Sequence, residues 1–140
     1  MLKGVKPCIS ADLIKILMEM GHGDELVIAD ANFPGAALAR NFVRADGVPA
    51  TELLDAILDL IPLDEYVEAP VVLMKVVKGD NAETPVWEDY RRIVDSKQKN
   101  VRFEYIDRFE YYERAKRAYA VVQSGELKKY SNILIKKGCL

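Results

Sequence analysis

Short apolar runs of strand length alternate with amphipathic helical segments along most of the chain, and this alternation restricts the fold more than any other feature. The run 71–77 is nearly continuously apolar, as a strand buried on both faces would be. It lies between a helix that Pro62 stops and a second helix that Thr84-Pro85 is expected to start. Strands and helices in alternation predict an α/β fold with a mixed, mainly parallel sheet that helices cover on both faces.

The same patterns predict where the elements lie. Strands are expected at residues 25–30, 42–45, 71–77, 101–106, 119–123 and 132–136, and helices at 11–20, 49–60, 85–96 and 108–118, with a short alanine-rich helix ending at residue 39. Ser10 is expected to cap the first helix, and Gly21 to end it with a positive φ, so that His22 leaves through a tight turn. Thr84 and Asp107 are expected to cap later helices. At 140 residues the chain is long enough for one domain with a substantial hydrophobic core.

The composition narrows the class of protein. Half of the residues are hydrophobic, 30% are charged and the formal net charge is -2, which is typical of a soluble globular protein and offers no basic surface for nucleic acid. The longest apolar runs are far shorter than the roughly 20 residues that cross a bilayer, and no signal peptide is evident, so we expect a cytoplasmic protein without membrane contact. Cys8 and Cys139 are too few for a disulfide framework and are expected to be free thiols.

The stretch 20–33 contains the strongest candidates for a functional site. Two glycines flank His22, the only histidine, and the strand that follows ends at Asp30. Ligands of open α/β sheets bind beyond the carboxyl ends of the strands, where Asp30 would lie. The imidazole of His22 can exchange protons near neutral pH, which suggests proton-transfer chemistry. Taken alone, His22 also fits a solvated turn, and Asp30 fits the cap of the next turn.

Motifs for nucleotides and metals are missing. Gly21-His22-Gly23 starts like a dinucleotide-binding loop, but no third glycine follows, and a strand takes the place of the required helix. The chain has no phosphate loop, no nucleophile elbow, no zinc-protease motif and no paired cysteines. With a single histidine, a transition-metal site would rest on carboxylates alone, so chemistry without a metal or other cofactor is favoured.

Aromatic and polar residues in the C-terminal third suit a sugar-sized ligand. Five aromatic residues lie there: Phe109, Tyr111, Tyr112, Tyr119 and Tyr130. Helical spacing assigns some of these rings to the core, but the phenols could also stack on a sugar and hydrogen-bond to it. Asn132 adds an amide at the start of the last strand. Arg108 opposes the helix dipole, which indicates another partner for its charge, whereas Asp64 most simply forms a turn.

Five stretches are distinctive when the chain is taken as a whole. They are Met20-Gly21-His22-Gly23-Asp24-Glu25, Ala29-Asp30-Ala31-Asn32-Phe33-Pro34, Arg44-Ala45-Asp46-Gly47, Arg108-Phe109-Glu110-Tyr111-Tyr112-Glu113-Arg114-Ala115 and Tyr130-Ser131-Asn132-Ile133-Leu134. In this order, and over essentially the full chain, they resemble the motifs of the fucose mutarotase / D-ribose pyranase family. Thr84-Pro85-Val86-Trp87 and the stretch 108–115 favour the fucose branch of that family. Ser131 is a departure, because the family more often has Gly or Ala there.

The resemblance implies a fold, an assembly and a reaction. It implies a three-layer α/β/α fold, rings of identical subunits that commonly form a decamer of two stacked pentamers, and interconversion of the anomers of a monosaccharide. His22 is implied as the proton donor, with Tyr112 as a second acid/base group. The implied sugar contacts are Asp30, Asp64, Arg108, Tyr130 and Asn132.

Mutarotation opens the pyranose ring and recloses it on the other face of C1, for which a pair of acid/base groups is sufficient. We expect His22 to act as acid at one oxygen and to reverse its role on closure. Tyr112 could serve the other oxygen, but an unperturbed phenol titrates near 10, so Arg108 would have to assist its ionisation.

One geometric difficulty follows from the strand between His22 and Asp30. At roughly 3.3 Å per residue, the two could be on the order of 20 Å apart. Either the glycine turn bends His22 toward the far end, or the pocket is shared between neighbouring subunits, which we favour. A D-ribose pyranase-type enzyme and a non-catalytic monosaccharide-binding protein remain as alternatives, whereas the missing phosphate loop disfavours a nucleotide-binding module.

Overall fold

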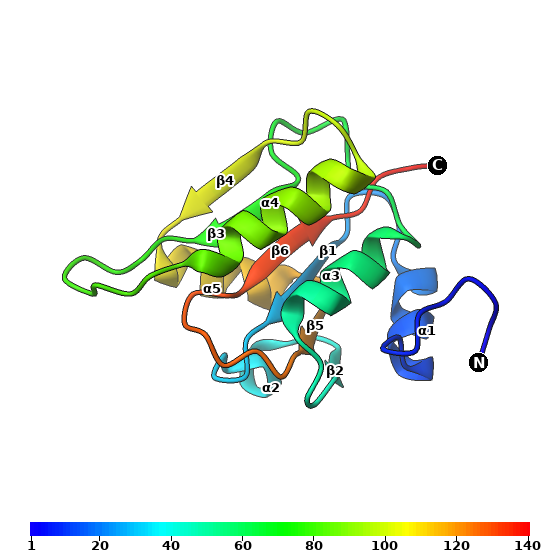
Figure 1. Cartoon of the computed structure of the whole chain (residues 1–140), viewed down its shortest axis with the longest axis horizontal. Coiled ribbons are helices and arrows are strands. Elements are labelled where there is room, and N and C mark those ends of the chain that lie inside the picture. The colour runs from blue at the N-terminus through cyan, green and yellow to red at the C-terminus, as the bar shows by residue number, and fades with distance from the viewer.

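The computed structural model describes all 140 residues and contains six strands and five helices (Figure 1). The strands are β1 (Glu25–Ala29), β2 (Phe42–Arg44), β3 (Val71–Met74), β4 (Phe103–Ile106), β5 (Ala120–Gln123) and β6 (Ile133–Lys136). The helices are α1 (Ala11–Glu19), α2 (Gly35–Leu38), α3 (Ala50–Leu58), α4 (Pro85–Lys97) and α5 (Arg108–Arg117). Every element expected from the sequence is present, with ends that differ by a few residues at most.

The strands form one mixed sheet in the order β2-β5-β1-β6-β3-β4. β1 and β2 pair parallel with β5, and β3 pairs parallel with β4. β6 runs antiparallel between β1 and β3, so β1 to β5 all point the same way and β6 alone is reversed. This confirms the predicted mixed, mainly parallel sheet. Below, the carboxyl end of the sheet is the end where β1 to β5 finish, and the amino end is the opposite one.

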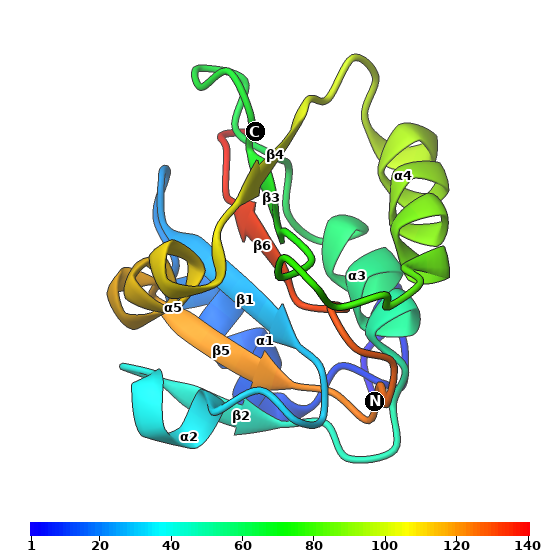
Figure 2. The same cartoon turned by 90° about the vertical axis from the view of Figure 1, so that its left-hand side faces the viewer.

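Helices cover both faces of the sheet, which gives the three layers that were expected. Side chains alternate along β1: Leu26 and Ile28 belong to the larger core cluster, under α1, α3 and α4, whereas Val27 and Ala29 belong to the smaller one, under α5. All four are fully buried. Figure 2 shows α3 and α4 on one side of the sheet and α2 and α5 on the other. The helices bury the central strands β1, β3 and β5, whereas the edge strand β4 keeps Glu104 and Tyr105 exposed.

The turn between α1 and β1 differs in detail from the sequence prediction. Ser10 caps α1 as predicted, since its Oγ accepts a backbone N–H at 3.1 Å. The positive φ expected at Gly21 is wrong: it lies at Gly23, where φ is +84°. Gly21 instead donates its N–H to Asp24 Oδ2 at 2.8 Å, which closes the turn from the other side. His22 therefore lies at the tip of a turn held by its neighbours.

Two other expected caps are wrong in detail. Pro85 begins α4 as predicted, but the Thr84 hydroxyl makes no capping hydrogen bond because its backbone, at φ -124° and ψ 55°, lies off the extended cap geometry. Asp107 occupies the N-cap of α5 without a side-chain bond to the helix. Its carboxylate lies 3.5 Å from Lys75 Nζ instead.

No helix has the length and apolar character to cross a bilayer. The longest, α4, has 13 residues, fewer than the roughly 20 that a span needs. Cys8 is half-buried and Cys139 is exposed, and both are free thiols, as predicted.

Candidate active site

Five of the seven residues singled out from the sequence line one hollow at the carboxyl end of the sheet. This hollow, here called the cradle, has a volume of about 360 Å³ and is lined by Asp30, Arg108, Tyr112, Tyr130 and Asn132 among others. Asp30 follows β1 and Arg108 begins the helix after β4. Asn132 reaches the same end because β6 is reversed and begins there. The strand directions thus collect residues that are up to 102 positions apart.

Asp30 and Asn132 are joined directly. The backbone N–H of Asp30 donates to Asn132 Oδ1 at 2.8 Å, and the Asp30 carboxylate accepts the N–H of Asn32 at 2.9 Å. Only 5% of Asp30 is exposed. Burial raises the pKa of this carboxyl above its ordinary value, although nearby backbone N–H groups favour the charged form. Asp30 is a poorly solvated acceptor, so a hydroxyl that donates to it gains more than it would in water.

Two buried polar residues at the end of β5 hold the turn that carries Asp30. Gln123 Nε2 donates to the carbonyl oxygens of Asp30 and, at 3.1 Å, Phe33. Ser124 Oγ donates to the carbonyl of Ala29 at 2.6 Å. Sequence reasoning missed both residues. The available signal was two adjacent polar residues where a buried apolar strand ends, which would put them at the same end of the sheet.

Tyr130 is fixed in an unusual backbone conformation by contacts on both sides. Its φ is +58°, in the left-handed region. Its phenol donates to Asp80 Oδ2 at 2.8 Å, and its carbonyl accepts the Trp87 indole N–H at 2.8 Å. The Tyr90 phenol donates to the next carbonyl, that of Ser131, at 2.6 Å. Burial, followed by the Asp80 hydrogen bond, raises the pKa of the Tyr130 phenol, so this group stays a neutral donor and acceptor.

Asp80 was not singled out from the sequence. It lies on the loop between β3 and α4, which projects from the body of the protein (Figure 1). The sequence offers no signal for it, because its link to Tyr130 spans 50 positions.

Arg108 and Tyr112 lie one turn apart on α5 and face the cradle together. The Arg108 guanidinium lies 4.7 Å from the ring centre of Phe109, and the arginines that form ion pairs are others. Its charge faces the cradle without a partner carboxylate. The ring of Tyr112 packs edge-on against Phe33, with 5.5 Å between centroids.

The other aromatic candidates lie outside the cradle. Tyr111 is fully buried in the smaller core cluster, and its hydroxyl has no hydrogen-bond partner. Tyr119 donates to Glu19 at 3.1 Å, near the amino end of the sheet. Phe109 is 70% exposed. Of the phenols in this group, only those of Tyr112 and Tyr130 therefore reach the cradle.

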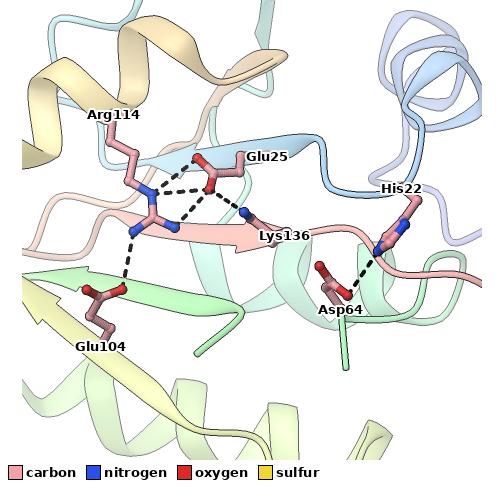
Figure 3. A network of polar contacts seen from close by, with 6 residues as sticks. All are labelled: His22, Glu25, Asp64, Glu104, Arg114 and Lys136. Carbon is pink, nitrogen blue, oxygen red and sulfur yellow. Dashed lines mark hydrogen bonds and ion pairs between the residues drawn. The ribbon is translucent and has the colours of Figure 1, made fainter. Parts of the chain in front are cut away.

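His22 and Asp64 form a separate pair at the amino end of the sheet (Figure 3). His22 Nε2 donates to Asp64 Oδ1 at 3.1 Å, and the same oxygen accepts the backbone N–H of Tyr66 at 3.0 Å. Burial by itself would raise the pKa of Asp64, but these hydrogen bonds and the neighbouring cations outweigh it and hold the pKa below its ordinary value. Because a carboxylate only accepts, the proton sits on Nε2, and Nδ1 is left as the atom that can exchange a proton.

The last strand holds both members of this pair in place. Asp64 donates its N–H to the carbonyl of Lys136 at 3.0 Å, and Gly23, next to the histidine, donates to the carbonyl of Lys137 at 2.8 Å. Asp64 is 3% exposed, whereas the side chain of His22 is 45% exposed. The buried Asp64 carboxylate therefore orients the imidazole of His22, which lies at the surface.

The seven candidates thus fall into two groups at opposite ends of the sheet, with β1 between His22 and Asp30. His22 lines a different hollow, with Met20, Ile61 and Lys137 among its neighbours. Asp64, expected with the sugar contacts, lies with His22. The separation anticipated from the length of the strand is therefore present within one chain.

An ionic network fixes α5 across the sheet. Arg114 Nη2 lies 2.8 Å from Glu25 Oε1, Arg114 Nη1 lies 3.2 Å from Glu104, and Lys136 approaches Glu25 at 3.4 Å (Figure 3). Glu25 begins β1 and Arg114 lies two positions after Tyr112. The network holds the helix that presents Arg108 and Tyr112 to the cradle. No group of three or more His, Cys, Asp or Glu side chains is arranged to hold a metal ion.

Comparisons with known proteins agree in identifying the family. A model described as the RbsD / FucU transport protein family matches residues 3–140. The L-fucose mutarotase of Histophilus somni is 52% identical over 139 residues, which are 99% of this chain and 96% of that protein. The crystal structure of the fucose mutarotase from Streptococcus pneumoniae, in complex with L-fucose, superposes with a TM-score of 0.93 at 46% identity and covers 99% of both chains.

A second solved structure, FucU from Bifidobacterium longum, superposes with a TM-score of 0.95 at 42% identity, again over 99% of both chains. Similarity of this extent includes both ends of the sheet and every element that carries a candidate residue. The chain belongs to the RbsD / FucU family.

Proposed function

We propose that this protein is an L-fucose mutarotase, which interconverts the α and β anomers of L-fucose. The observation that carries the proposal is 52% identity, over 99% of the chain, to a protein named L-fucose mutarotase. The cradle supports it, since its carboxylate, guanidinium, amide and two phenols offer the mixed donors and acceptors that a polyhydroxylated ligand needs.

The chemistry requires two coordinated proton transfers. Ring opening removes the proton from the anomeric hydroxyl, breaks the C1–O5 bond as the C1=O1 bond forms, and delivers a proton to O5. Closure on the other face of C1 reverses each step. In our proposal His22 exchanges its proton through Nδ1, while Asp64 keeps Nε2 protonated and stabilises the imidazolium when it forms. Asp64 thus acts through His22.

The remaining groups hold the sugar and serve the second oxygen. Tyr112 is the second acid/base group, with the unpaired Arg108 charge beside it on α5 to favour its ionised form. Asp30, Tyr130 and Asn132 bind the other hydroxyls. Holding the sugar at hydrogen-bond distance from the acid/base groups shortens both proton transfers.

We further propose that each site is shared between two copies of the chain. The His22–Asp64 pair of one copy would complete the cradle of the next, because the two groups lie at opposite ends of one sheet. A contact that joins the amino end of one copy to the carboxyl end of another is head-to-tail and generates rings when it closes. This supports an assembly of ring-shaped homo-oligomers, with a decamer of two stacked pentamers as the expected form. The free thiols agree with a cytoplasmic location.

The proposal is tested by measuring anomer exchange with NMR for L-fucose and D-ribose. Wild type should accelerate exchange of L-fucose well above the rate in buffer, and the His22→Gln variant should lose most of this acceleration. Equal acceleration on both sugars would make the substrate assignment too narrow and favour a pyranase. Binding of L-fucose without acceleration would identify a non-catalytic monosaccharide-binding protein.

A further inference from the structure

Polar groups and aromatic rings line most of the cradle, and two of its side chains, here called the wall, are wholly apolar. Of the side chains that line it, only those of Phe33 and Met74 carry no nitrogen or oxygen. Phe33 is 6% exposed and Met74 is 4% exposed, so each presents a small surface to the hollow and is otherwise embedded in the smaller core cluster. The wall is therefore rigid, being the outer edge of packed core.

The charged part of the lining is unsuited to an apolar substituent. Asp80 already accepts the Tyr130 phenol, and Lys129 lies 3.9 Å from the same carboxylate. An alkyl group placed against these charges would remove water from them and return no hydrogen bond. The Phe33–Met74 wall can receive such a group without that cost.

L-fucose carries one apolar substituent, the methyl group at C5, whereas its other ring substituents are hydroxyls. We propose that the Phe33–Met74 wall is the subsite for this methyl group, and that it makes the enzyme selective for 6-deoxyhexoses. This inference rests on the proposed mutarotase activity. The wall then also orients the sugar, because the methyl group against it directs the hydroxyls toward the polar side of the cradle.

Three sugars of matched stereochemistry test the subsite on the wild-type protein. D-arabinose is L-fucose without the methyl group. L-galactose is L-fucose with a hydroxyl added to the methyl carbon. Loss of one methyl group from an apolar subsite lowers kcat/KM by roughly 10-fold or more, so L-fucose should exceed D-arabinose by about this factor. L-galactose should also fall below L-fucose, because its extra hydroxyl would be buried without a partner.

A matched pair of variants assigns the effect to the wall. Met74→Gln keeps the length of the side chain but adds an amide, and should lower the ratio of kcat/KM for L-fucose to that for L-galactose by about fivefold or more. Met74→Leu keeps the apolar surface and should hold this ratio within about twofold of wild type. Met74 is the better target because Phe33 also packs against Tyr112.

The outcomes separate the two proposals. If wild type does not accelerate exchange of L-fucose, the proposed function fails. If it accelerates L-fucose and D-arabinose with equal kcat/KM, the mutarotase stands and the methyl subsite is overturned. An unchanged ratio in a folded Met74→Gln protein likewise overturns it, and if that variant does not fold, the wild-type series with three sugars decides.

Discussion

A site shared between subunits predicts that two impaired variants restore each other's activity. His22→Gln removes the proton-exchanging group at the amino end of the sheet, and Asp30→Asn weakens the cradle at the carboxyl end. Loss of the acid/base group should lower kcat/KM by about a hundredfold or more, and loss of the carboxylate by about tenfold or more. In a randomly mixed ring, about a quarter of the junctions unite an intact His22 with an intact Asp30.

The mixed protein should therefore show about a quarter of wild-type activity per subunit, several times the mean of its parents. The two variants are co-expressed with different affinity tags, purified through both tags in succession, and assayed by NMR exchange on L-fucose. The matched control pairs His22→Gln with a chain that carries both substitutions, in which no junction can be complete. Activity of the mixed protein no greater than the mean of its parents would place both groups in one chain's own site and refute the shared pocket.

Three further predictions concern individual groups. Tyr112→Phe should lower kcat by about a hundredfold with little loss of stability, because the ring packing is kept, and near-normal kcat would assign the second proton transfer to another group. Trp87→Phe removes the indole donor to the Tyr130 carbonyl. It should cost about 1 kcal/mol of unfolding free energy and raise KM for L-fucose. An unchanged KM would show that the segment around Tyr130 keeps its place without this hydrogen bond. The pKa of Asp64 is lowered in the folded state, so its carboxylate stabilises the fold at neutral pH, and that contribution is lost as pH falls below the unfolded pKa of roughly 4 and through the lower folded pKa. Urea unfolding should accordingly show a smaller loss of stability between about pH 5 and 3 in Asp64→Asn than in wild type, and equal losses would show that the ionised Asp64 carboxylate adds nothing to stability.

The strands and helices could be predicted because each follows from a local pattern of residues. β3 is an apolar run, and Pro85 marks the start of α4. Finer backbone detail could not be predicted in the same way. Gly21 and Gly23 both permit a positive φ, and the choice between them depends on the hydrogen bond from the Gly21 N–H to Asp24.

The candidate site was predictable in part. Asp30 follows from its place after a strand, whereas the partnership of His22 with Asp64 spans 42 positions and depends on how two loops meet the last strand. Tyr111 and Tyr112 are adjacent in sequence and differ only in the face of α5 on which they lie. Local pattern does not separate them, and the resemblance to a family assigned the role to Tyr112.

The reversed strand β6 touches both groups of the candidate site. Its first residue follows Asn132 of the cradle, its last residue accepts the N–H of Asp64, and the next residue, Lys137, accepts the N–H of Gly23 beside His22. The four residues of this strand, which pairs with β1 and β3, therefore set the distance between the two surfaces. If those surfaces meet in neighbouring copies, the length of β6 also sets the spacing from one site to the next. An insertion of a single residue in β6 would then displace His22 from the neighbouring cradle at every subunit contact of the ring.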